Sequence, residues 1–191
     1  MEILEVRTLR GPNYWSGYWK KLIIMRLDIG AYEKKPTNKI KGLYDRMLDV
    51  LPSLQSHGCS YGEPGGFLKR VEEGTWAGHA IEHFALEMQT LAGMDTGYGR
   101  TRETGEKGIY NVVYSYLEEE VGRFAGRVAV RLWLDLAEGK DLAEIKLGLA
   151  ADIQEMREIR ENVRFGPSTG SLVDEADHRD IPFIRLNDQS L

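Results

Sequence analysis

The chain has 191 residues, of which 42% are hydrophobic and 29% are charged, a composition typical of a globular domain. Its formal net charge of -5 argues against nucleic-acid binding through a basic surface. The only cysteine, Cys59, excludes a disulfide within the chain and favours a reducing compartment. No run reaches the roughly 18 apolar residues of a membrane span, and the first residues lack the apolar core of a signal peptide. We therefore expect a cytoplasmic protein without a membrane partner.

The first part of the chain is predicted to mix strands and helices. Residues 2–9 alternate in the manner of a strand, with Ile3 on one face and Val6 on the other. Residues 21–29 are apolar enough to form a central strand. A helix is expected over residues 40–51, where Pro52 ends it, and a glycine-rich loop follows over residues 56–66.

The next elements are predicted to be helices around one β-hairpin. A short helix over residues 66–74 precedes a longer one over residues 75–91. The strands 96–103 and 109–116 flank the turn "TGEKG", which is typical of a hairpin. Two long helices follow over residues 117–138 and 141–162, the second with a heptad-like apolar seam. An antiparallel sheet with a hairpin, packed against several helices, is an α+β fold.

The end of the chain departs from this pattern at "FGPSTGS". Residues 171–191 predict a short helix, a turn at Asp180 and a strand at "PFIRL". One helix and one edge strand cannot make a core alone. We therefore expect a domain over residues 1–162, and a linker with the incomplete start of another domain over residues 163–191.

The string "GHAIEHFALEMQ" places His79 and His83 four residues apart on the predicted helix 75–91, so that both can face one ion. Glu82 precedes the second histidine, which makes the string H-x-x-E-H, the inverted zincin motif. Neutral imidazoles suit zinc, and a nearby carboxylate can take a proton from a zinc-bound water. The alternative is an amphipathic helix that carries two histidines by chance.

A third zinc ligand is expected from a carboxylate, a histidine or the cysteine. In "LEEEVGR", Glu120 lies beside the apolar stripe of the next long helix, so it is the preferred ligand, and Glu119 is the second choice. Glu87 lies one turn after His83 and is either a ligand or a hydrogen-bond partner of an imidazole. His57 and Cys59 are either loop residues or a metal-binding or reactive pair.

Arginines are the candidate substrate-binding residues. Arg100 and Arg102 lie on the predicted hairpin, where Arg100 could bind a carboxylate through two hydrogen bonds. Arg123, Arg127 and Arg131 are four residues apart and form either a solvated helix face or a patch for carboxylates. No Walker A or G-x-G-x-x-G pattern is present, so no nucleotide site is expected in this sequence.

Several long strings, in order along nearly the whole chain, resemble the N-terminal region of the cyanophycin synthetases. They include "LRGPNYWS", "GGFLKRVEEGTWAGHAIEHFALEMQ", "GYGRTRE", "GIYNVVYSYLEEEVGR" and "GPSTGSLVDEADHRDIPFIRLN". The resemblance implies a part of a multi-domain ligase that uses ATP to make multi-L-arginyl-poly-L-aspartate (cyanophycin), with partners in the remaining domains and a homo-oligomer of the full-length enzyme. ATP and Mg²⁺ would serve only the ATP-grasp and Mur-ligase-like domains, which this sequence does not include.

For this region the resemblance implies binding of the polymer. In some family members this region is also a metallopeptidase that cuts cyanophycin into primers for polymerisation, and the resemblance extends this expectation to the present chain. His79, Glu82 and His83 match that motif, so the hypothesis is a zinc peptidase in which Glu82 is the base and Arg100, Arg102, Arg123 and Arg127 bind substrate. The alternative hypotheses are a module that tethers the polymer without cutting it and a module for oligomerisation.

Overall fold

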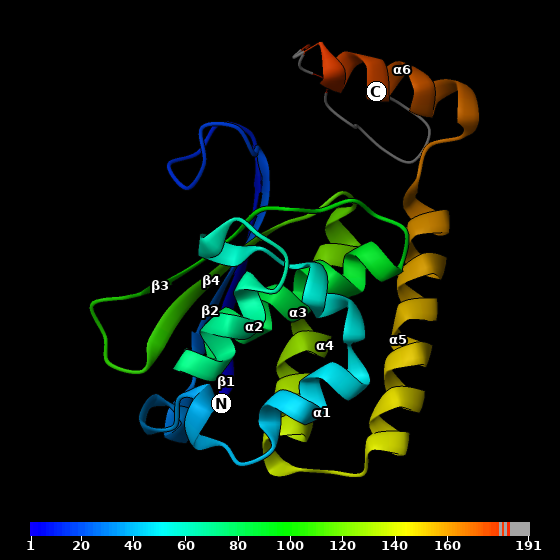
Figure 1. The fold of residues 1–191 in the computed structure, drawn as a ribbon. Helices are drawn as coiled ribbons and strands as arrows, with labels where there is room; N and C mark the ends of the chain where they lie inside the picture. Colours follow the sequence, from blue (N-terminus) through cyan, green and yellow to red (C-terminus); the bar gives the residue numbers. More distant parts are fainter. Residues whose placement is uncertain (180, 182, 184–191) are drawn as a thin grey trace.

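The computed structural model describes residues 1–179, 181 and 183. It consists of one antiparallel sheet packed against a layer of helices (Figure 1). The sheet has the order β1-β2-β4-β3, with strands β1 (Glu2–Arg10), β2 (Lys21–Asp28), β3 (Gly99–Glu103) and β4 (Ile109–Ser115). β3 and β4 form the predicted hairpin, and the predicted α+β fold is confirmed.

The first strand differs from the strict alternation that its sequence suggested. The register between β1 and β2 shifts between Ile3 and Glu5, which marks a β-bulge. The additional residue turns Ile3 and Val6 toward the same face, where both pack against the main hydrophobic core. The prediction that these two side chains lie on opposite faces was therefore wrong, because the side-chain alternation changes at a bulge.

The helices begin and end within a few residues of the predicted bounds. Short 3-10 turns connect β2 to the first helix and follow that helix. The α-helices are α1 (Leu43–Val50), α2 (Gly66–Glu73), α3 (Ala77–Leu91), α4 (Glu119–Glu138), α5 (Leu142–Val163) and α6 (Pro167–His178). No helix of the described residues is long and apolar enough to cross a membrane.

The main core lies between one face of the sheet and the helices α3 and α4. Met25 of β2, Tyr114 of β4 and Trp133 of α4 are all buried in it. The apolar seam of α5 also packs into this core, through Ile145 and Met156. The predicted seam therefore packs inside the domain.

The opposite face of the sheet carries a smaller apolar cluster. Leu22, Ile24 and Val113 are buried there, and Trp15 and Trp19 pack over them from the loop between β1 and β2. Because both faces of β2 are covered, its largely apolar sequence agrees with its central position.

The last described helix starts earlier than expected. α6 begins at Pro167, inside the segment that we interpreted as a break, because proline is favoured in the first turn of a helix, where its missing N–H has no partner to lose. It lies beyond the end of α5 (Figure 1). The predicted turn at Asp180 lies outside the described residues, as does the predicted strand at 182–186 apart from Phe183. The domain division at residue 162 stays a prediction.

Candidate metal centre

Helix α3 is held close to the sheet at its first turn. A Cβ atom on Gly78 would lie 3.2 Å from Thr101 Cγ2 and 3.3 Å from Val112 Cγ2, so only a glycine allows this approach without a shift of the neighbours. Glu82 lies one turn after Gly78 and therefore also faces the sheet, whereas His79 and His83 follow these two residues by about 100° around the helix. Glu82 thus faces β3, whereas the two histidines lie on the neighbouring flank of α3, where both rings contact Phe67 of α2.

The imidazole of His79 is oriented by a threonine that precedes the helix. Its Nδ1 lies 2.9 Å from Thr75 Oγ1, which leaves Nε2 available as a ligand atom. Thr75 is fixed in turn, because its N–H donates to Thr37 Oγ1 at 2.9 Å and the Thr37 hydroxyl donates to the Val71 carbonyl at 2.7 Å. The corner between α2 and α3 therefore determines the position of this ring.

The glycine-rich loop before α2 folds back onto α3 and brings Cys59 to His79. Phe67 N–H donates to the His57 carbonyl at 3.0 Å, and a Cβ on Gly66 would collide with the carbonyl oxygen of Gly58. Cys59 itself has a φ of 48°, a left-handed conformation that costs a non-glycine residue about 1 kcal/mol or more. Its Sγ lies 3.2 Å from His79 Nε2.

Cys59, His79 and His83 form one candidate metal-binding group. Their ligand atoms all lie within 4.8 Å of one another, and this is the only such group of three or more in the part of the chain that the structure describes. A tetrahedral zinc ion, with bonds of about 2.3 Å to sulfur and 2.0–2.1 Å to nitrogen, separates its ligand atoms by roughly 3.3–3.6 Å. One thiolate and two imidazoles are a donor set that suits zinc, with a fourth position left for water.

Two successive hydrogen bonds link the Nδ1 side of His83 to His57 and then to Glu87. His83 Nδ1 lies 2.8 Å from His57 Nδ1, and His57 Nε2 lies 2.5 Å from Glu87 Oε2. If the Nδ1–H of His83 donates to His57, the Nε2–H of His57 donates to the Glu87 carboxylate. His83 Nε2 is then the ring nitrogen available to a metal. Glu87 is therefore the hydrogen-bond partner of an imidazole, that of His57, which is one of the two roles that its sequence position left open.

The environment favours the neutral form of the His79 and His83 imidazoles. Burial, with a smaller contribution from the positive charge of Arg70, lowers the pKa of His79 to about 4. Burial and the two neighbouring histidines lower the pKa of His83 well below its ordinary value. Burial acts to raise the pKa of Glu87, but hydrogen bonds from His57 and Ser53 outweigh it and lower the pKa overall. Neutral imidazoles are the form that binds a metal.

Glu82 precedes His83 in the chain and faces strand β3. Its Oε2 accepts a hydrogen bond of 2.6 Å from Thr101 Oγ1, and a Cβ on Gly99 would collide with its carboxylate. Burial raises the pKa of Glu82 to about 8, against the opposing effects of the Thr101 hydrogen bond and of Arg102 and Arg100. A carboxyl group with a pKa near neutral pH can accept a proton in one step and return it in the next.

The structure does not bring Glu119 or Glu120 to the histidines. Glu119 pairs with Arg10 through contacts of 2.6 and 2.8 Å, and the side chain of Glu120 is exposed at the start of α4. Neither belongs to the group around His79, where Cys59 takes the third place instead. Sequence spacing could not show this, because the position of Cys59 depends on how the glycine-rich loop folds.

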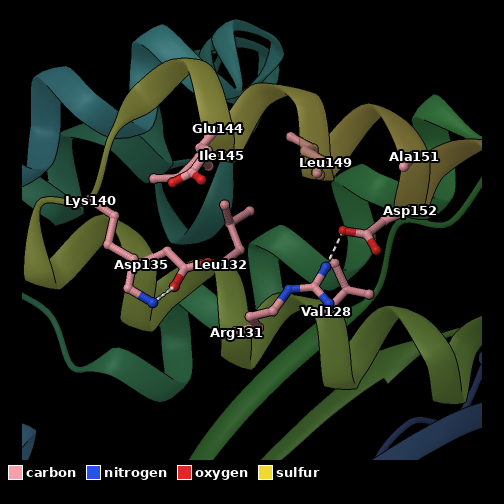
Figure 2. Close-up of a pocket in the computed structure, with 11 residues that line it drawn as sticks. Val128, Arg131, Leu132, Asp135, Lys140, Glu144, Ile145, Leu149, Ala151 and Asp152 are labelled. Atoms are coloured by element: carbon pink, nitrogen blue, oxygen red, sulfur yellow. Dashed lines mark hydrogen bonds and ion pairs between the residues drawn. The ribbon is translucent and has the colours of Figure 1, made fainter.

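The predicted arginine stripe on α4 makes contacts within the chain. Arg123 donates to Thr8 Oγ1 at 2.9 Å, and the Arg127 guanidinium lies 5.7 Å from the ring centre of Phe124. Arg131 pairs with Asp152 across a pocket between α4 and α5, as Figure 2 shows. By contrast, Arg100 and Arg102 are exposed on β3, on either side of the threonine that binds Glu82.

These features define an α+β domain with a sulfur and nitrogen donor set beside a buried glutamate on one helix. The chain belongs to the family of cyanophycin synthase-like N-terminal domains, whose sequence model matches residues 24–138. It is 51% identical over 191 residues to the cyanophycin synthetase of Synechocystis sp. and 50% identical over 192 residues to that of Crocosphaera subtropica. Each alignment covers 100% of this chain but 22% of the relative. The cyanophycin synthetase of Trichormus variabilis is also 50% identical, over 187 residues, with 98% of this chain and 20% of the relative covered.

The family match confirms the resemblance inferred from the sequence strings. The chain spans about a fifth of the length of these curated relatives. The family assignment therefore applies to this domain.

Proposed function

We propose that this domain is a zinc-dependent peptidase of a cyanophycin synthetase, which cuts multi-L-arginyl-poly-L-aspartate into shorter chains that prime polymerisation. The observation that supports this proposal is the convergence of Cys59, His79 and His83 within 4.8 Å, with Glu82 on the same helix. The rest of the synthetase would add the ATP-dependent ligation and is the natural partner of this domain.

Each residue of the site has a distinct task in this proposal. The Cys59 thiolate and the two imidazoles hold the metal, while His57 and Glu87 keep the tautomer of His83 that exposes Nε2. Bound zinc would lower the pKa of a coordinated water to about 7 and polarise a carbonyl group. Glu82 takes a proton from the attacking water and delivers it to the leaving amine.

The test begins with the metal content of the purified protein. We expect about one zinc per chain in the wild type and a loss of zinc in Cys59→Ser and His79→Ala. His178→Ala is the matched control, because His178 is exposed on α6, and it should keep its zinc. A wild-type protein that binds no zinc after incubation with the ion would contradict the metal site.

The second step tests the chemistry with purified cyanophycin, whose shortening is followed on gels. Glu82→Gln should retain zinc and lose at least about 100-fold in cleavage rate, because a general base typically contributes 10² to 10⁴. Equal cleavage by the wild type and Glu82→Gln would exclude Glu82 as the base.

A tethering function without cleavage is the second candidate. The exposed guanidinium groups of Arg100 and Arg102 favour it, since each polymer unit carries a free carboxylate. In that case the protein binds cyanophycin with unchanged affinity in the Glu82→Gln variant, and no product appears with the wild type at any zinc concentration.

A further inference from the structure

Strand β3 is an edge strand, and it contacts Glu82 of the helix that carries the candidate metal ligands. In the order β1-β2-β4-β3, β3 pairs only with β4 among the described strands. Its five residues run along the flank of α3 that carries Glu82, and Thr101 of β3 donates to Glu82. An unpaired strand edge presents main-chain donors and acceptors to any extended chain that approaches it.

The register identifies which main-chain groups face outward. The Tyr98 carbonyl accepts from Ser115 N–H at 2.8 Å, and Thr104 N–H donates to the Ile109 carbonyl at 3.0 Å, so these two residues face β4. Because the direction alternates along an antiparallel strand, Arg100 and Arg102 also face β4 with their main-chain groups. The N–H and C=O groups of Gly99, Thr101 and Glu103 therefore point away from the sheet.

Successive side chains of β3 lie on opposite faces of the strand. Thr101 points toward α3 and contacts Glu82, and a side chain at Gly99 would collide with the same carboxylate. Arg100 and Arg102 alternate with these residues, so they lie on the opposite face, where both are exposed. A chain paired with the outer edge would thus pass beside Glu82 on one face and the two arginines on the other.

We propose that the outer edge of β3 binds the main chain of the substrate as an additional β-strand. The inference rests on the proposed peptidase function and names how that site holds its substrate. The occupant is an extended poly-aspartate main chain whose side chains end in a carboxylate and a guanidinium group. Main-chain hydrogen bonds to Gly99, Thr101 and Glu103 supply the alignment, as in strand addition elsewhere.

The charges along this edge match such a chain. Arg100 and Arg102 can pair with the free carboxylates, and the exposed carboxylate of Glu103 can pair with a guanidinium. Each polymer unit carries a negative carboxylate and a positive guanidinium, and the strand offers positive arginines and a negative glutamate to pair with them. The same pairing holds the substrate chain extended beside Glu82. A fixed, extended chain presents one peptide carbonyl to an attacking water in a defined orientation.

The decisive variant removes one outward N–H without touching the pairing with β4. Proline at an outward position of an edge strand is tolerated, so Glu103→Pro should fold, and Glu103→Ala is the matched control for the loss of the side chain. We expect Glu103→Pro to weaken polymer binding about fivefold or more relative to Glu103→Ala, with unchanged zinc content, when both are measured in the Glu82→Gln background. Equal affinity of the two variants overturns the proposal.

Hydrogen exchange gives a second measurement that needs no change in β3. In Glu82→Gln protein saturated with cyanophycin, the amides of Gly99, Thr101 and Glu103 should become protected at least about tenfold. Absence of added protection at saturation overturns the proposal, even if the polymer is cut by the wild type. Protection without any cleavage by the wild type would instead refute the peptidase and keep the binding strand.

Discussion

Glu82 makes the stability of the zinc-free protein depend on pH in a way that one substitution should abolish. Glu82 is 4% exposed, and burial raises the pKa of its carboxyl group from 4.5 to about 8. In the unfolded chain it releases its proton near pH 4.5, whereas in the folded protein it keeps the proton until about pH 8. The folded state therefore loses stability as the pH rises from about 4.5 to 8, because the unfolded state binds fewer protons in this range.

The size of the effect follows from the two pKa values. The difference between 4.5 and about 8, at about 1.36 kcal/mol for each pH unit, corresponds to roughly 5 kcal/mol over the full range. Between pH 5 and pH 8 the expected loss is on the order of 3–4 kcal/mol. Glu82→Gln does not titrate, and its amide oxygen can still accept the hydrogen bond from Thr101.

The assay is urea unfolding of chelator-treated wild type and Glu82→Gln at several pH values from 5 to 8, followed by tryptophan fluorescence. The low pKa values of His79 and His83 destabilise both proteins as the pH falls below 6.5, so they cancel in the difference. We expect Glu82→Gln to gain stability relative to the wild type as the pH rises. A difference in unfolding free energy that stays constant across this range would refute the argument.

Two further predictions concern the supports of the site. Glu87→Gln should reduce zinc affinity about 10- to 100-fold, because it weakens the hydrogen bond that orients His57. The affinity is measured by competition with a chelator. An unchanged affinity would show that the hydrogen bonds from Glu87 to His57 and from His57 to His83 have no effect on zinc binding. Gly66→Ala should lower the unfolding free energy by about 1–3 kcal/mol, because its Cβ collides with the Gly58 carbonyl. Gly148→Ala, where a Cβ meets nothing within 4 Å, is the control and should be neutral or stabilising.

Local patterns predicted most of the elements but not all of their details. The helices α3, α4 and α5 and the hairpin β3–β4 follow from apolar periodicity and turn residues, which act over short distances in the chain. The bulge in β1 was missed, because it changes which residues pair across strands without changing the apolar pattern. The start of α6 at Pro167 was missed because a glycine- and serine-rich segment gives a weak helical signal.

The sequence by itself determined the pair His79 and His83 and the place of Glu82 between them, because helical spacing alone puts such residues on neighbouring parts of one surface. Only the tertiary structure decided what completes the group. The loop that carries Cys59 folds onto α3, whereas Glu119 is held by Arg10 and Glu120 faces solvent. The third position depends on contacts between segments about 20 residues apart or more, and these are set by packing of the whole domain, which no local spacing encodes.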